Sequence, residues 1–129
     1  MLVKVFLETF KNMDNPPALI MKTSSAGFSV MDRDTIFQKI EEIKHGVQAK
    51  SLPKIYFLHG ELHDEEMNEL YNYPKVKAMV SLTKGEGFGR PLLEFTRSQK
   101  PIMATAWSGH VDFLDRESSF PVSYTHLTL

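Results

Sequence analysis

The sequence of 129 residues predicts an α/β fold, in which a mainly parallel sheet carries helices on both of its faces. Two features of the chain support this class. Short apolar runs, each typical of a buried strand, alternate with longer segments whose apolar residues recur every three or four positions. The alternation itself indicates parallel strands, because a crossover helix joins one parallel strand to the next.

The N-terminal segment favours an amphipathic helix. Its apolar residues recur at the spacing of one helix face, and they are Val3, Phe6, Phe10 and Met13. Alternation over residues 3–7 leaves a strand as the alternative. The Pro16-Pro17 pair ends this element, and residues 18–21 then indicate a short buried strand that ends at Lys22.

The middle of the chain continues the pattern. A helix with Asp32 or Asp34 as its cap presents an apolar face, made of Ile36, Ile40, Ile43 and Val47. Residues 55–58 are expected to form the next strand. A short helix follows, with Asp64 as its cap and Pro74 just beyond its end.

The last elements are again a strand, a helix and a strand. They are expected over residues 77–82, 91–98 and 102–104, respectively. Another helix is expected to begin near Val111 or Asp112.

The composition excludes several classes of protein. The formal net charge of -1 at pH 7 gives no bulk electrostatic reason to bind nucleic acid. The absence of cysteine excludes disulfides and thiolate metal ligands, and it fits a cytoplasmic location. No apolar run approaches the roughly 20 residues that a membrane-spanning helix needs. Residues 1–7 are too short an apolar run for a signal peptide, and Lys4 interrupts them.

The most informative segment is Gly85-Glu86-Gly87-Phe88-Gly89-Arg90-Pro91-Leu92-Leu93-Glu94. It follows a predicted strand and opens a predicted helix, and ligands of open α/β sheets bind at such carboxyl ends of strands. Glycines let the backbone approach a ligand closely, and a helix start offers free N–H groups to an anion.

The two glutamates of this segment suit a ligand with several hydroxyl groups. Glu86 lies in the loop, and Glu94 lies about one turn into the helix if Pro91 is the first helical residue. Ionised carboxylates only accept hydrogen bonds, so a ribose diol or a sugar ring is a good partner. A sugar nucleotide carries hydroxyls at both ends and phosphate in the middle.

The run from Glu86 to Glu94 resembles the E-x7-E signature of GT-B glycosyltransferases of the retaining group 1, the GT4-like enzymes. Its flanks are similar to that family as well. Residues 77–83 resemble the strand before the signature, residues 100–110 the strand and glycine turn after it, and residues 55–60 an earlier strand near the nucleobase. The resemblance covers about residues 1–118, and its specific part is residues 55–115.

The resemblance implies the Rossmann-like C-terminal half of a truncated GT-B fold. Such an enzyme transfers a sugar from a nucleotide-diphosphate sugar to an acceptor, with retention of configuration and without a required metal or other cofactor. Glu86 would act in the catalytic site by contacting hydroxyls of the donor sugar, and Glu94 would accept both ribose hydroxyls. The backbone N–H groups of Gly87, Phe88 and Gly89 would meet the sugar and phosphate.

Two basic residues are further candidates for donor binding. Arg90 is a candidate phosphate or sugar contact, and Lys22 would supply charge for the diphosphate. Simpler interpretations stay open for each: an exposed arginine at a helix start and a surface lysine. Glu86 could likewise be a solvated loop carboxylate, Glu94 a first-turn glutamate that favours the helix dipole, and Phe88 a core residue. Residues 107–110 indicate a turn, with a lid or an acceptor contact as the alternative.

The resemblance also sets the expected domain organisation. Residues 1–120 would form part of the donor-binding domain, which the chain enters inside the first helix, after a strand and basic residues that hold the diphosphate. Residues 121–129 do not continue the family pattern and resemble translated sequencing-adapter read-through, so they are left out of the fold prediction. The expected partners are a nucleotide sugar, an unknown acceptor such as a glycan or lipid, and the N-terminal GT-B domain.

Two other functions remain as alternatives. A degenerate subunit could bind sugar nucleotides without transferring the sugar. A different Rossmann-like protein could carry the segment by chance, in which case the two carboxylates would point away from the crevice.

Overall fold

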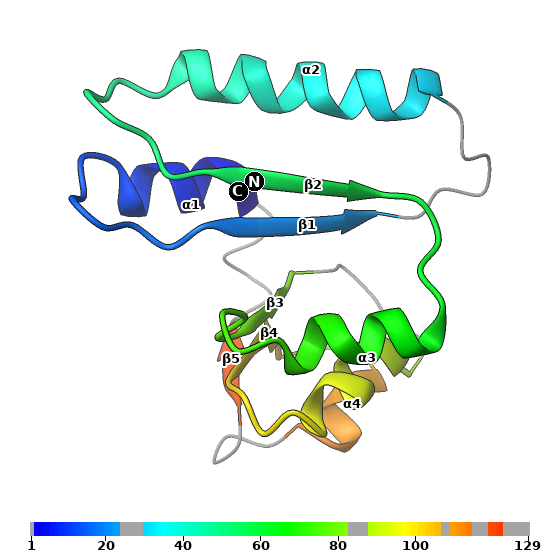
Figure 1. The fold of residues 1–129 in the computed structure, drawn as a ribbon. Helices are drawn as coiled ribbons and strands as arrows, with labels where there is room; N and C mark the ends of the chain where they lie inside the picture. Colours follow the sequence, from blue (N-terminus) through cyan, green and yellow to red (C-terminus); the bar gives the residue numbers. More distant parts are fainter. Residues whose placement is uncertain (1, 24–29, 83–87, 107–108, 115–118, 123–129) are drawn as a thin grey trace. The chain divides into compact units, whose positions relative to one another are not determined.

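Helices and parallel strands alternate along the chain in the computed structural model, which describes residues 2–23, 30–82, 88–106, 109–114 and 119–122 (Figure 1). The chain divides into two compact units, Met1–Glu61 and Leu62–Leu129. Every strand pairing in the described residues is parallel, which confirms the predicted α/β class. The sequence predicted one sheet, whereas the described strands form one sheet of two strands and one of three.

The first unit contains α1 (Leu2–Phe10), β1 (Leu19–Thr23), α2 (Val30–Gly46) and β2 (Ile55–His59). The N-terminal segment is therefore helical, and the strand alternative is wrong. Strands β1 and β2 pair in register from Leu19 opposite Ile55 to Thr23 opposite His59. Side chains of all four elements and their flanking loops meet in one apolar core, made of Val3, Leu7, Val47, Leu19, Met21, Ile43, Leu52 and Ile55.

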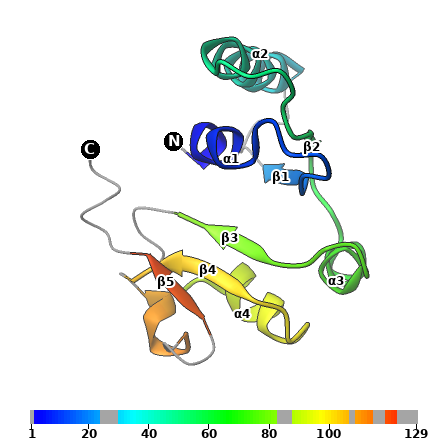
Figure 2. The same cartoon turned by 90° about the vertical axis from the view of Figure 1, so that its left-hand side faces the viewer.

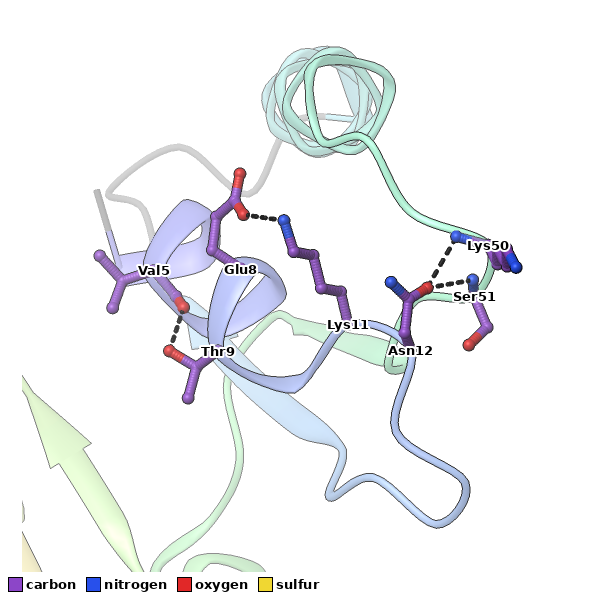
Figure 3. A network of polar contacts seen from close by, with 7 residues as sticks. All are labelled: Val5, Glu8, Thr9, Lys11, Asn12, Lys50 and Ser51. Atoms are coloured by element: carbon purple, nitrogen blue, oxygen red, sulfur yellow. Dashed lines mark hydrogen bonds and ion pairs between the residues drawn. The ribbon is translucent and has the colours of Figure 1, made fainter.

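One asparagine connects the end of α1 to the segment before β2 (Figure 3). Asn12 has a left-handed backbone with φ 58°, a conformation that asparagine tolerates better than most residues. Its side-chain oxygen accepts the backbone N–H groups of Lys50 at 2.7 Å and Ser51 at 3.1 Å. Its own N–H donates to the carbonyl of Ser51 at 2.9 Å. These bonds join residues 38 and 39 positions apart in the sequence.

The second unit contains α3 (Asp64–Asn72), β3 (Met79–Ser81), α4 (Arg90–Thr96), β4 (Ile102–Thr105), the 3-10 turn η1 (Gly109–Asp112) and β5 (Phe120–Val122). Strand β4 lies between β3 and β5 (Figure 2). The core joins both helices to β4, and its buried residues are Tyr71, Leu92, Phe95, Ile102 and Ala104. The rings of Tyr71 and Phe95 meet edge to face, with their centroids 5.3 Å apart.

Two predicted helix caps are wrong. Helix α2 begins at Val30, so Asp32 and Asp34 both lie inside its first turns. The sequence placed the helix start from the apolar face, which begins only at Ile36, and the helix extends before that face. Asp64 is the first residue of α3, and His63 holds the cap position. The carboxylate of Glu66 accepts the His63 backbone N–H at 2.8 Å, which satisfies the donor at this end of the helix.

The ends of the second unit also differ from the prediction. The helix expected near Val111 is a single 3-10 turn that begins at Gly109. Strand β3 is limited to three residues, where six were expected over residues 77–82. Strand β5 was not expected, because residues 121–129 were left out of the fold prediction. Pro121 lies within β5 opposite Ala104 of β4, and residues 123–129 lie outside the described part of the chain.

The described strands form the parallel pair β1-β2 and the parallel triplet β3-β4-β5. Helix α2 lies in the connection from β1 to β2, and helix α4 in the connection from β3 to β4. Both sheets are thus consistent with the Rossmann-like class.

We expect the Asn12 contacts to stabilise the first unit. Asn12→Gly removes the side-chain acceptor but keeps the left-handed backbone, and it should lower the free energy of unfolding by about 1–2 kcal/mol. Asn12→Ala should cost about 1 kcal/mol more, because alanine is strained at this φ. Urea unfolding followed through amide signals of residues 2–23 measures both. Asn15→Ala, at an exposed position nearby, is the control; equal stabilities of all three variants would contradict the assignment.

Candidate functional site

The candidate site is the segment that joins β3 to α4, at the carboxyl end of β3. Glu86 and Gly87 lie outside the described residues, so their predicted roles stay predictions. The described part of the segment begins at Phe88 and continues through Gly89 into α4. This order of parallel strand, loop and helix agrees with the arrangement that the sequence predicted.

Gly89 is a glycine for two structural reasons. Its backbone is left-handed, with φ 83°, a conformation that L side chains rarely adopt. A Cβ atom at this position would also lie 2.8 Å from the Cβ of His110, closer than two carbon atoms can approach. Its carbonyl accepts the N–H of Leu93 at 3.0 Å and so makes a first bond of α4. Gly89 therefore determines where the helix begins.

Helix α4 begins one residue earlier than expected. Its first residue is Arg90, and Pro91 is second, where its missing N–H is still unneeded by the helix. The shift places Arg90 and Glu94 four positions apart on one helix face. The guanidinium Nε donates to a Glu94 carboxylate oxygen at 2.7 Å. The pKa of Arg90 is raised by this hydrogen bond and by the charges of Glu94 and Asp64.

The Arg90–Glu94 pair is accessible to a ligand. The Arg90 side chain is 74% exposed and that of Glu94 40% exposed. An exposed ion pair of this kind contributes little to stability, so a ligand can replace it at small cost. The carboxylate also keeps acceptor positions that Arg90 does not use. A shallow hollow of about 350 Å³ lies over this part of α4, lined by Arg90, Leu93, Glu94, Thr96 and Arg97.

Phe88 is not a core residue, which overturns one alternative. It is 53% exposed. Its ring contacts the ring of Phe113, with centroids 5.3 Å apart and the planes inclined at 49°. The contact joins the loop before α4 to the residues just after η1, and it leaves much of the Phe88 ring open to solvent.

Lys22 belongs to the first unit, at the end of β1. Its ammonium group donates to the backbone carbonyl of Gly60, just beyond the end of β2. The bond therefore connects the carboxyl ends of the two paired strands. An ammonium group has three donors, so this contact does not prevent Lys22 from binding an anion. Its predicted role in donor binding stays a prediction.

Glu94 also acts on a buried tyrosine. Burial raises the pKa of Tyr71, and the negative charge of Glu94 raises it further. Tyr71 lies on α3 and belongs to the core of the second unit. The same carboxylate therefore accepts the hydrogen bond from Arg90 and acts electrostatically on a residue of the core.

The sequence did not single out His110 as a buried residue. Residues 107–110 were expected to form a turn, and η1 confirms a turn at Gly109 and His110. Trp107 and Ser108 lie outside the described residues. The His110 side chain is only 1% exposed and its Nε2 contacts the carbonyl of Thr105. A histidine in a glycine-containing turn usually indicates a surface position, so no pattern in the sequence identified this packing.

The described residues offer neither a metal site nor a membrane span. No group of three or more histidine, aspartate, glutamate or cysteine residues there could hold a metal ion. No helix of that part of the chain is both long and apolar enough to cross a membrane.

Comparisons of the chain with protein-family models, with curated proteins and with solved structures gave no match.

The Glu94 charge gives a testable shift at Tyr71. Glu94→Gln should lower the pKa of Tyr71, while burial keeps it above the ordinary 10.0. The pKa of the Tyr71 hydroxyl is higher in the folded chain than in the unfolded chain, so the unfolded chain loses the hydroxyl proton at a lower pH. The free energy of unfolding should therefore fall as the pH rises above about 10. Tyr71→Phe should remove that contribution.

Tyrosine ring signals followed by NMR against pH measure the pKa, and unfolding at pH 8 and above pH 10 measures the stability. Glu41→Gln is the control, because Glu41 forms a comparable ion pair with Lys44 in α2 and is also about 41% exposed. An unchanged Tyr71 pKa in Glu94→Gln would show that this carboxylate is not where the structure places it.

Proposed function

We propose that the chain binds the nucleotide-diphosphate sugar of a retaining glycosyltransferase that requires no metal. The observation that supports it best is the β3–α4 junction: a left-handed Gly89 between a parallel strand and a helix, with the half-exposed carboxylate of Glu94 one turn further on. The carboxyl end of a parallel strand is where open α/β sheets bind ligands. The acceptor, and an N-terminal domain to bind it, complete the proposed enzyme.

Glu94 has the chemistry to bind the ribose. An ionised carboxylate accepts two hydroxyl groups at once, as a vicinal diol offers them. Such charge-assisted hydrogen bonds are about twice as strong as neutral ones, which offsets loss of the exposed contact to Arg90. In this proposal the ribose hydroxyls replace part of the Arg90 contact.

Arg90 has two roles in the proposal. In the free protein it holds the Glu94 carboxylate in one orientation through the 2.7 Å bond. In the complex its exposed guanidinium, with five donors, becomes available to a phosphate oxygen. Positive charge beside the diphosphate would stabilise the negative charge that develops on it as the sugar leaves.

Glu86 completes the proposed site from the loop. It would hold hydroxyls of the donor sugar so that the anomeric carbon faces the acceptor, a positioning role that does not need proton transfer. A cytoplasmic location belongs to the same proposal, since a chain without cysteine suits a reducing compartment.

Ligand binding by the full chain tests the proposal. UDP-, GDP- and ADP-sugars are titrated separately and followed by NMR. One nucleotide class should bind, and Glu94→Gln should weaken it by about 10- to 100-fold, the value of a lost charge-assisted hydrogen bond. Glu86→Gln should weaken binding as well.

Glu41→Gln is the matched control and should bind like the wild type, because it removes the same charge from an ion pair in α2. A folded chain that binds none of the three classes would overturn the proposal, as would equal affinities of Glu94→Gln and the wild type. Binding by the chain without sugar transfer in the complete enzyme would favour the non-catalytic alternative.

A further inference from the structure

A buried histidine lies directly against the candidate donor loop. His110 is 1% exposed, and its Cβ is the atom that a side chain at Gly89 would strike. Its carbonyl accepts the N–H groups of Phe113 at 3.3 Å and Leu114 at 3.1 Å. The ring of Phe113 in turn contacts that of Phe88. Gly89 therefore lies against His110 itself, and Phe88 contacts Phe113, whose N–H donates to the His110 carbonyl.

The imidazole of His110 is anchored through one nitrogen. Nε2 lies within hydrogen-bonding distance of the backbone carbonyl of Thr105, the last residue of β4. A carbonyl accepts only, so Nε2 is assigned the proton and Nδ1 the lone pair. Nδ1 is buried and has no hydrogen-bond partner in the described structure. Nε2 also lies 3.5 Å from the Thr105 hydroxyl oxygen, so both polar contacts of this ring are with the last residue of β4.

The Nε2 bond lies at the carboxyl end of β4, next to the carboxyl end of the neighbouring strand β3. Strands β3 and β4 pair in parallel, with Ser81 opposite Ala104, so the loop after β3 and the end of β4 leave the same edge of the sheet. The imidazole holds η1 to the end of β4, and Gly89 packs on the Cβ of the same residue. The position of Gly89 therefore depends on where β4 holds His110.

We propose that His110 is a positioning residue that holds the Gly89 turn, and through it the start of α4 with Arg90 and Glu94, in the conformation that binds the nucleotide sugar. The identity of the ligand rests on the proposed function, whereas the restraint that His110 places on the Gly89 turn does not. Because Gly89 has no side chain of its own, neighbouring groups must fix its backbone. The Nε2 bond supplies that restraint from the end of β4, which pairs with β5 at Thr105.

Two polar substitutions distinguish the effect of the Nε2 hydrogen bond from the effect of burying a polar side chain. In His110→Gln the amide nitrogen reaches about as far along the side chain as Nε2 and can donate to the Thr105 carbonyl. In His110→Asn the amide is shorter and cannot reach it. Both variants bury an amide in the same place, so a purely structural cost of polarity affects them alike.

Hydrogen exchange of the Leu93 amide reports on the turn without any ligand, because this N–H donates to the Gly89 carbonyl at 3.0 Å. His110→Asn should speed exchange at Leu93 by up to about tenfold, the effect of losing one hydrogen bond, and weaken nucleotide-sugar binding by a similar factor. His110→Gln should restore both. Ile102→Val is the control, because it perturbs a buried residue of the same core without changing the Nε2 bond. It should leave nucleotide-sugar binding unchanged, and it should change Leu93 exchange only as much as it changes the overall stability.

The outcomes are distinguishable. Equal behaviour of the Gln and Asn variants in both readouts would overturn the proposal, as would a Gln variant with a protected Leu93 but weakened binding. If the wild type binds no nucleotide sugar, the proposed function fails, and Leu93 exchange alone decides whether His110 holds the turn.

Discussion

The close approach of Gly89 to His110 is the constraint on which the geometry of the candidate site depends. It allows no side chain at residue 89, and it places the start of α4 against the turn that follows β4. The helix start then determines that Arg90 and Glu94 share one face of α4. A change at the end of β4 would therefore move charged groups that lie on a different element.

The same helix separates an apolar face from a charged one. Leu92 and Phe95 are almost fully buried against α3 and β4, whereas Arg90 and Glu94 remain open to solvent. Burial of two large side chains contributes roughly 1.5–3 kcal/mol each, several times the value of an exposed ion pair. The core thus holds α4 in place, and the charged pair is free to exchange partners.

Periodicity in the sequence was sufficient to predict the order and type of most elements, because apolar spacing follows directly from which face is buried. Periodicity failed to place the first residue of a helix, and it failed to identify contacts between residues that are distant in the sequence. Asp32 and Asp34 have the chemistry of helix caps but lie inside α2, since residues before the apolar face extend the helix. The burial of His110 likewise follows from its packing on Gly89, which no local pattern records.

The strands of the second unit show why it is hard to predict which face of a parallel strand is buried and which is exposed. Strand β4 buries Ile102 and Ala104, yet Met103 between them is 43% exposed and lies opposite Phe120 of β5, which is 61% exposed. Strands of parallel sheets are apolar on both faces, so their sequences carry no alternation that marks one side as solvent-facing. The run Ile102–Met103–Ala104 therefore predicted a strand correctly but gave no sign of which residues meet α4. The choice of face follows from the crossover that joins β3 through α4 to the parallel strand β4, because such connections are almost always right-handed.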